Sequence, residues 1–155
     1  MTAPRFGFFF WPYEPDLVAR MVRLGESQGW DLVGIADTPG KAMDVWVALA
    51  QAATLSARVT LASCVTNLAT REPAITAGAA AALGQLSGGR FVLGIGAGHS
   101  GVVNVGRRPT PPAALREGLA HVRALLDGGG VAAPGRVPVY AAASGPSALR
   151  AAAYL

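Results

Sequence analysis

Three glycines and a histidine make residues 90–100 the segment with the clearest chemical character. An apolar run ends there in Gly94, Gly96 and Gly98, and His99 follows at once. Glycine carries no Cβ, so a ligand can approach the backbone closely at the end of such a strand. Histidine changes its charge near neutral pH, which suits a group that gives or takes a proton. We therefore expect a ligand site here, with His99 as the candidate catalytic residue.

Two further side chains and one helix start are candidates for binding. Asp37 ends a buried run, where its carboxylate either contacts a cofactor or caps the turn before Pro39. Cys64 is interpreted first as a small buried residue, because no base lies near it in the sequence. Ser144 precedes a proline-initiated helix, so this junction is either a phosphate seat or an ordinary connection. Two histidines and one cysteine do not form a set of metal ligands, and no metal is expected.

Residues 96–101 also satisfy the pattern G-x-G-x-x-G, which is typical of dinucleotide-binding loops. In such proteins the pattern follows the first strand, opens a helix directly and precedes an acidic residue about 20 positions on. Here the pattern follows the fourth predicted strand. The position about 20 residues on, where the acidic residue should stand at the end of a strand, lies inside a predicted helix. A Rossmann-type NADP-binding protein is therefore the weaker alternative.

Strands and helices are predicted to alternate along the chain. The predicted strands are residues 6–11, 31–36, 59–65, 91–95 and 137–142. The first run is continuously apolar, as expected of a strand covered on both faces. A loop of roughly a dozen residues, longer than is usual for such a connection, follows the fourth strand and is expected to be functional. The alternation predicts right-handed βαβ units and a parallel sheet, with ligands bound beyond the carboxyl ends of the strands.

Composition narrows the classes of protein that fit. Hydrophobic residues make up 52% of the 155 residues and charged residues 14%, so the chain is expected to fold. The formal net charge is +4, but the basic residues are scattered, which argues against nucleic acid and fits a small anionic molecule. One cysteine is compatible with a reducing compartment, and no apolar run suits a signal peptide or a membrane span. We expect a cytoplasmic protein.

Several motifs together resemble the bacterial luciferase-like monooxygenase superfamily. They are DVWVALAQAATLSARVTL at 44–61, CVTN at 64–67, REPA at 71–74 and LSGGRFVLGIGAG at 86–98. Segments 29–37 and 139–146 also fit, so the resemblance covers nearly the whole chain in order. Within the superfamily, the sequence is similar to the branch that uses the deazaflavin coenzyme F-420, the methylenetetrahydromethanopterin reductase-like proteins.

The resemblance implies an α/β fold, a parallel (β/α)8 TIM barrel that holds F-420 or FMN at its C-terminal mouth. It places Asp37 beside the cofactor ring, and it matches Cys64-Val65 with a non-prolyl cis peptide of the family. The implied cofactor contacts are Asp37, Cys64, Val65, Thr66, Asn67, Gly96, Ala97, Gly98, Ala143, Ser144 and Gly145. His99 stands where relatives often have an acidic residue, which alters the expected proton handling. The implied activity is hydride transfer between the cofactor and a small organic substrate, or monooxygenation of that substrate.

The resemblance implies relatives about twice as long as these 155 residues, and a barrel of this type needs on the order of 250 residues. Residues 1–155 are expected to form a single domain, an incomplete barrel of about five βα units that corresponds to the N-terminal half. Five strands of eight leave open sheet edges and an uncovered apolar interior, which favour pairing with another chain. The expected partners are a second copy or a complementing chain. A non-catalytic half-barrel of this kind is the alternative function.

Overall fold

The computed structural model describes residues 3–129, 131 and 136–153, so both ends of the predicted domain 1–155 lie outside the described residues. The strands are β1 (Gly7–Phe10), β2 (Leu32–Ile35), β3 (Thr60–Ser63), β4 (Thr66–Asn67), β5 (Phe91–Gly96) and β6 (Val139–Ala142). The α-helices are α1 (Pro15–Ser27), α2 (Val45–Leu55), α3 (Pro73–Leu86), α4 (Ser100–Asn104), α5 (Pro112–Ala124) and α6 (Pro146–Ala152). A short π-helical turn, η1 (Leu125–Gly129), follows α5.

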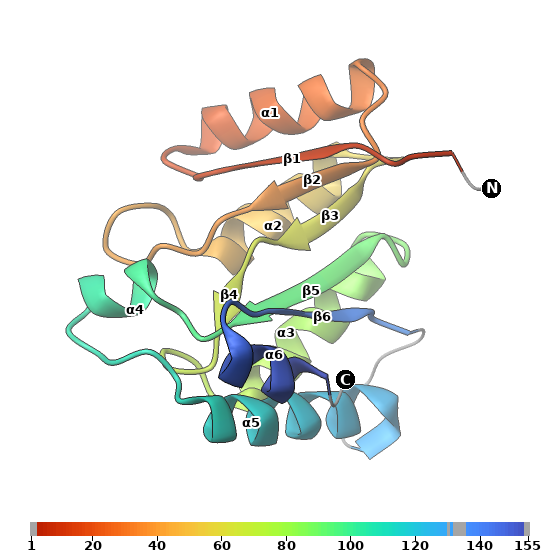
Figure 1. Ribbon diagram of the computed structural model, residues 1–155. Helices are drawn as coiled ribbons and strands as arrows, with labels where there is room; N and C mark the ends of the chain where they lie inside the picture. The colour runs from red at the N-terminus through yellow and green to blue at the C-terminus, as the bar shows by residue number, and fades with distance from the viewer. Residues whose placement is uncertain (1–2, 130, 132–135, 154–155) are drawn as a thin grey trace.

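All strand pairs in the sheet are parallel. The strands β1, β2, β3 and β5 follow one another across the sheet, and both β4 and β6 pair with β5. Because β4 continues β3 after a two-residue interruption, the described strands form five βα-type units, as predicted. Helices α1, α2 and α3 cover one face of this sheet, and α5 packs beside α3 (Figure 1).

The helix starts follow from local chemistry. Helices α1, α3, α5 and α6 each begin with proline, whose missing N–H is not needed in the first turn and whose φ already suits a helix. Helix α2 instead begins after Asp44. Its Oδ1 accepts hydrogen bonds from the backbone N–H of Trp46 at 2.9 Å and of Val47 at 3.2 Å. These starts direct each helix back along the strand that precedes it.

The core lies between the sheet and the helices. Alternate strand residues point toward the helices and are buried: Val33, Ile35, Leu61, Phe91, Leu93 and Ile95. The helices contribute Val18, Val22, Leu49, Leu115 and Leu119 to the same core. Burial of these side chains is the main favourable contribution to folding and makes the sheet a rigid support for the loops at its carboxyl edge.

The other face of the sheet is open in the described part of the chain. A cavity of about 500 Å³ runs along it, and Phe9 and Tyr140 are 55% and 64% exposed at its sides. The prediction that the run 6–11 is covered on both faces is therefore wrong, because no described element packs against this side of β1. The uncovered apolar interior expected of an incomplete barrel is confirmed.

Two local features differ from simple strand and loop assignments. The third predicted strand is interrupted by a cis peptide bond between Cys64 and Val65, after which β4 begins. The segment after β5 was predicted as a loop but contains the short helix α4. Val102 in this helix is fully buried, and one turn of helix directs it into the interior. No helix in the described residues is both long and apolar enough to cross a membrane.

Candidate active site at the carboxyl ends of the strands

A cavity of about 360 Å³ opens where the parallel strands end. Nine of the twelve predicted site residues line it. They are Asp37, Cys64, Val65, Asn67, Gly96, Ala97, Gly98, His99 and Ser144. Parallel strands bring their carboxyl ends to one edge of the sheet, which is why residues more than a hundred positions apart meet here.

Three predicted contacts, Thr66, Ala143 and Gly145, do not line this cavity. Thr66 is 1% exposed, and its Oγ1 donates a hydrogen bond of 2.7 Å to Oδ2 of Asp37. Thr66 therefore holds Asp37 in place instead of facing the cavity. Ala143 and Gly145 flank Ser144 between β6 and α6. Direct contact of these three residues with a cofactor stays a prediction.

Asp37 is the half-buried carboxyl group of the site. Burial disfavours its charged form and raises its pKa above the ordinary value, and the nearby Asp44 carboxylate acts in the same direction. The hydrogen bond from Thr66 and the positive charge of Arg71 lower the pKa and oppose this shift. The net effect keeps Asp37 protonated to a higher pH than an exposed aspartate, so the group can serve as a hydrogen-bond donor as well as an acceptor.

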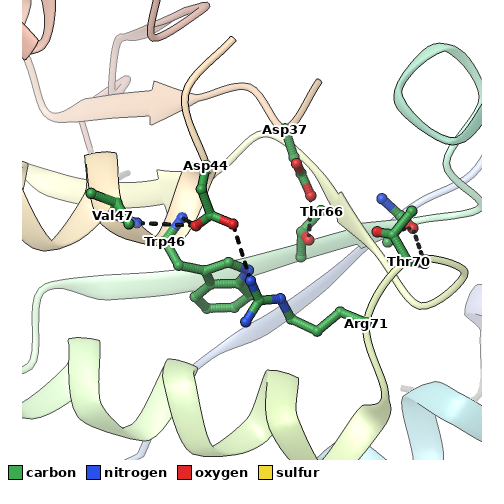
Figure 2. Close-up of polar contacts among 8 residues, drawn as sticks. Asp37, Asp44, Trp46, Val47, Thr66, Thr70 and Arg71 are labelled. Atoms are coloured by element: carbon green, nitrogen blue, oxygen red, sulfur yellow. Dashed lines mark hydrogen bonds and ion pairs between the residues drawn. The ribbon is translucent and has the colours of Figure 1, made fainter. Parts of the chain in front are cut away.

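Asp44, Trp46 and Arg71 form a cluster near Asp37 that was not predicted from the sequence (Figure 2). Oδ2 of Asp44 accepts a hydrogen bond of 3.1 Å from Nη2 of Arg71, while its Oδ1 caps α2. The Arg71 guanidinium also lies 5.3 Å from the centre of the Trp46 ring, a cation–π contact. This cluster joins the start of α2 to the loop before α3. The sequence shows an aspartate before α2 and the REPA motif at 71–74. It does not show that Asp44 and Arg71 of these two segments form a pair.

Asn67 is fixed by the same loop. Its Oδ1 accepts hydrogen bonds from the backbone N–H of Ala69 at 3.1 Å and from the backbone N–H and the hydroxyl of Thr70, both at 3.0 Å. Three donors on one oxygen orient the carboxamide, which is 1% exposed and lines the cavity. The side chain is therefore held in one orientation before any ligand binds.

The glycines at the end of β5 make room for the neighbouring segment that contains Ser63 and Val65. A Cβ added at Gly94 would collide with the carbonyl oxygen of Ser63, and one added at Gly96 would lie 2.9 Å from Cγ2 of Val65. The expectation that these glycines open the backbone to a ligand is thus correct only in part. Gly96 lines the cavity, whereas Gly94 accommodates the neighbouring strand just before the cis peptide that follows Cys64.

His99 lies at the exposed rim of the cavity, at the N-cap position of α4. Two contacts hold the segment around it. Nη1 of Arg107 donates a hydrogen bond of 2.6 Å to the carbonyl of Ala69, and the N–H of Thr110 donates one of 2.8 Å to the carbonyl of Ala97. The imidazole is exposed to solvent at the mouth of the cavity.

Trp11 is a lining residue that was not predicted. Its Nε1 donates a hydrogen bond of 3.1 Å to Oγ1 of Thr38, and its ring centre lies 5.4 Å from that of Phe9, which also lines the cavity. The signal was present as an aromatic residue at the end of the run 6–11. It was overlooked because that run was interpreted as a strand covered on both faces.

The polar groups of the cavity suit an organic ligand. They are a carboxyl group, a carboxamide, hydroxyl groups and an imidazole. Within the residues that the structure describes, no three His, Cys, Asp or Glu side chains are grouped so that they could hold a metal ion. The polar lining residues offer hydrogen bonds to such a ligand.

Comparison with known proteins agrees with this geometry. The sequence profile described as luciferase-like monooxygenase matches residues 12–155. The chain belongs to this family. The resemblance inferred from the motifs is thus confirmed. Among curated family members, a 5,10-methylenetetrahydromethanopterin reductase of Methanolobus tindarius is 35% identical over 162 residues, which cover 93% of this chain and 49% of that protein.

Solved structures of the luciferase-like type share the fold. A coenzyme F420-dependent tetrahydromethanopterin reductase from Methanopyrus kandleri superimposes with a TM-score of 0.83 at 26% identity, over 96% of this chain and 52% of that one. The oxygenating constituent of a 3,6-diketocamphane monooxygenase of Pseudomonas putida, solved with FMN, gives a TM-score of 0.67 at 22% identity. It covers 81% of this chain and 40% of that one, and at this identity it supports the fold alone.

The chain spans about half the length of the curated relatives it matches. The described strands therefore correspond to part of a luciferase-like TIM barrel, and the predicted fold class is confirmed over that part.

Proposed function

We propose that this chain carries the cofactor-binding part of an F-420- or FMN-dependent oxidoreductase that acts on a small organic substrate. The observation that supports it most directly is the gathering of nine of the twelve predicted residues around one cavity at the strand ends. Membership of the luciferase-like monooxygenase family supports the class of reaction. A bound flavin or deazaflavin would supply two-electron hydride chemistry, or react with O₂ in its reduced flavin form.

The residues of the cavity fit such a group. Asn67, with its carbonyl oxygen already taken by three donors, would present its amide N–H to the polar edge of a ring. Gly96 lines the cavity without a Cβ, which would let a flat ring approach its backbone. At Gly98 a Cβ would instead meet Val102 and Asn67, so this glycine lets the chain pack against itself. Ser144, exposed at the β6–α6 junction, would contact the ribityl-phosphate side.

Two groups would handle protons. Oδ2 of Asp37 is occupied by the Thr66 hydroxyl, so Oδ1 is the atom that would hold or release a proton toward a ligand. The raised pKa of Asp37 suits this task, because the protonated form persists closer to neutral pH. His99 at the rim would pass protons between the cavity and the solvent.

Cofactor fluorescence titrations test the proposal, with F-420 and FMN added separately to the purified chain. His99→Ala should weaken binding about fivefold, the effect of losing one hydrogen bond of about 1 kcal/mol. The matched control is His121→Ala, which removes an exposed histidine of α5 that does not line the cavity. The proposal fails if neither cofactor binds the folded chain, or if the two variants weaken binding equally.

A second candidate is a half-barrel that pairs with another chain, either a second copy or a complementing polypeptide. The exposed Phe9 and Tyr140 on the inner face favour it, as do the outer edges of β1 and β6, which pair with one strand each among those described. Sedimentation equilibrium over a range of concentrations tests self-pairing. A dimer that dissociates on Phe9→Ser and Tyr140→Ser would support it, and a monomer at all concentrations would leave only a different chain as partner.

A further inference from the structure

Trp11 is held in place by contacts that leave its ring facing the cavity. The indole N–H, which is its only hydrogen-bond donor, is used by Thr38 at 3.1 Å, and Thr38 is itself buried. The backbone on both sides of Trp11 is also fixed. The N–H of Ala36 donates to the carbonyl of Phe10 at 2.9 Å, and that of Met43 donates to the carbonyl of Pro12 at 2.9 Å. The residue nevertheless remains 42% exposed.

A fixed and partly exposed indole beside a cavity is a surface for an apolar ring. A tryptophan whose polar atom is satisfied offers only its flat apolar faces and edges. Phe9 extends this surface, since its ring lies 5.4 Å from Trp11 at an angle of 60°. Because the Trp11 ring is already held by its hydrogen bond to Thr38, little conformational entropy is lost when a ligand packs against it.

The cavity thus has a polar part and an apolar part. The polar part includes Asp37, Asn67 and Ser144, which follow β2, end β4 and follow β6. The apolar part comes from Phe9 and Trp11 on and just after β1, the strand at one end of the described sheet. A flavin or deazaflavin needs hydrogen bonds along its ring edge and tail, which the polar part supplies. The apolar part offers no hydrogen-bonding groups and suits the face of a flat apolar ring.

We infer that Trp11 and Phe9 form the wall that binds a flat apolar ring of the organic substrate. The inference rests on the proposed function only in naming the ligand a substrate, since the binding of such a ring needs no cofactor. The alternative source of a flat ring at this wall is the cofactor itself, and the experiment separates the two.

The test measures the dissociation constant of menadione, a flat apolar bicyclic probe, by equilibrium dialysis against the full chain. Trp11→Leu keeps apolar volume but removes the flat ring, and we expect it to raise the dissociation constant about tenfold, or about 1.4 kcal/mol. Trp11→Phe keeps a flat ring and should stay within about threefold of the unaltered chain. The matched control is Tyr13→Leu, because Tyr13 is an exposed aromatic residue of the same loop that does not line the cavity.

A parallel dialysis with FMN distinguishes substrate from cofactor. Unchanged FMN binding in Trp11→Leu, together with weakened menadione binding, supports the inference. Three results overturn it: menadione does not bind the folded chain, Trp11→Leu binds menadione as tightly as Tyr13→Leu does, or Trp11→Leu weakens FMN as much as menadione.

A second variant covers the case in which Trp11→Leu does not fold, and the menadione result does not depend on cofactor binding. If circular dichroism shows that Trp11→Leu does not fold, Thr38→Val removes the hydroxyl that holds the indole, and unaltered menadione binding in that variant overturns the inference. Menadione binding that depends on Trp11 supports the inference even where FMN and F-420 do not bind, so failure of the proposed function is detected separately.

Discussion

Asp44 joins the start of α2 to Arg71 in the loop before α3, and its contacts contribute to the free energy of unfolding. One carboxylate oxygen caps α2 through two backbone N–H groups, and the other accepts from Arg71. Removing an aspartate cap costs about 1 kcal/mol of unfolding free energy. The pair with Arg71 is partly exposed and adds about 0.5 kcal/mol. Asp44→Ala should therefore destabilise the chain by about 1.5 kcal/mol.

Asp44→Asn separates the two contributions. Asparagine caps helices about as well as aspartate, so this variant loses only the charge paired with Arg71 and should cost about 0.5 kcal/mol. Urea unfolding of both variants, followed by circular dichroism at neutral pH, measures the difference. Equal losses for Asp44→Ala and Asp44→Asn would refute the reasoning, because the cap would then contribute nothing.

Three further predictions concern single side chains. The raised pKa of Asp37 means that the folded state binds its proton more tightly than the unfolded state, so stability falls as pH rises above the ordinary aspartate range. Asp37→Asn should lack this fall in urea unfolding measured as a function of pH. Gly94→Ala should cost about 2–3 kcal/mol because its Cβ meets backbone, whereas Gly78→Ala, which meets nothing within 4 Å, should be neutral or stabilising. Burial opposes the charged form of Glu26, but three backbone N–H donors and Arg58 outweigh it and lower the pKa, so Glu26→Gln should lack a loss of stability as pH falls through the glutamate range.

The strand ends of the site were predictable because their signals are local. Asp37 and residues 64–67 and 96–99 each follow an apolar run, and parallel strands necessarily bring such positions to one edge. The pairing of Asp44 with Arg71 was not predictable in this way. Each residue has a sufficient local explanation, as a helix cap and as a loop residue, and their contact depends on how two neighbouring β–α connections pack.

The open face of the sheet and the short helix α4 could not be predicted from the sequence, for different reasons. A run such as 6–11 has large apolar residues at both alternating positions, so it has the same pattern whether one face or two are covered. The alternation of exposed Phe9 with buried Phe10 appears only once the sheet is formed. Helix α4 has five residues and one buried side chain, Val102, which is too short for a helical period to be detected.

The most direct test of the central claim is a thermal melt of the chain, alone and with excess F-420, FMN or NADPH, followed by circular dichroism. A ligand at about 100 times its dissociation constant adds about 2.7 kcal/mol to the free energy of unfolding. The account predicts a cooperative melt whose midpoint rises by about 5–10 °C with F-420 or FMN and does not move with NADPH. A midpoint that is unchanged by all three, or raised by NADPH alone, would contradict the claim that these strand ends hold a flavin-type cofactor.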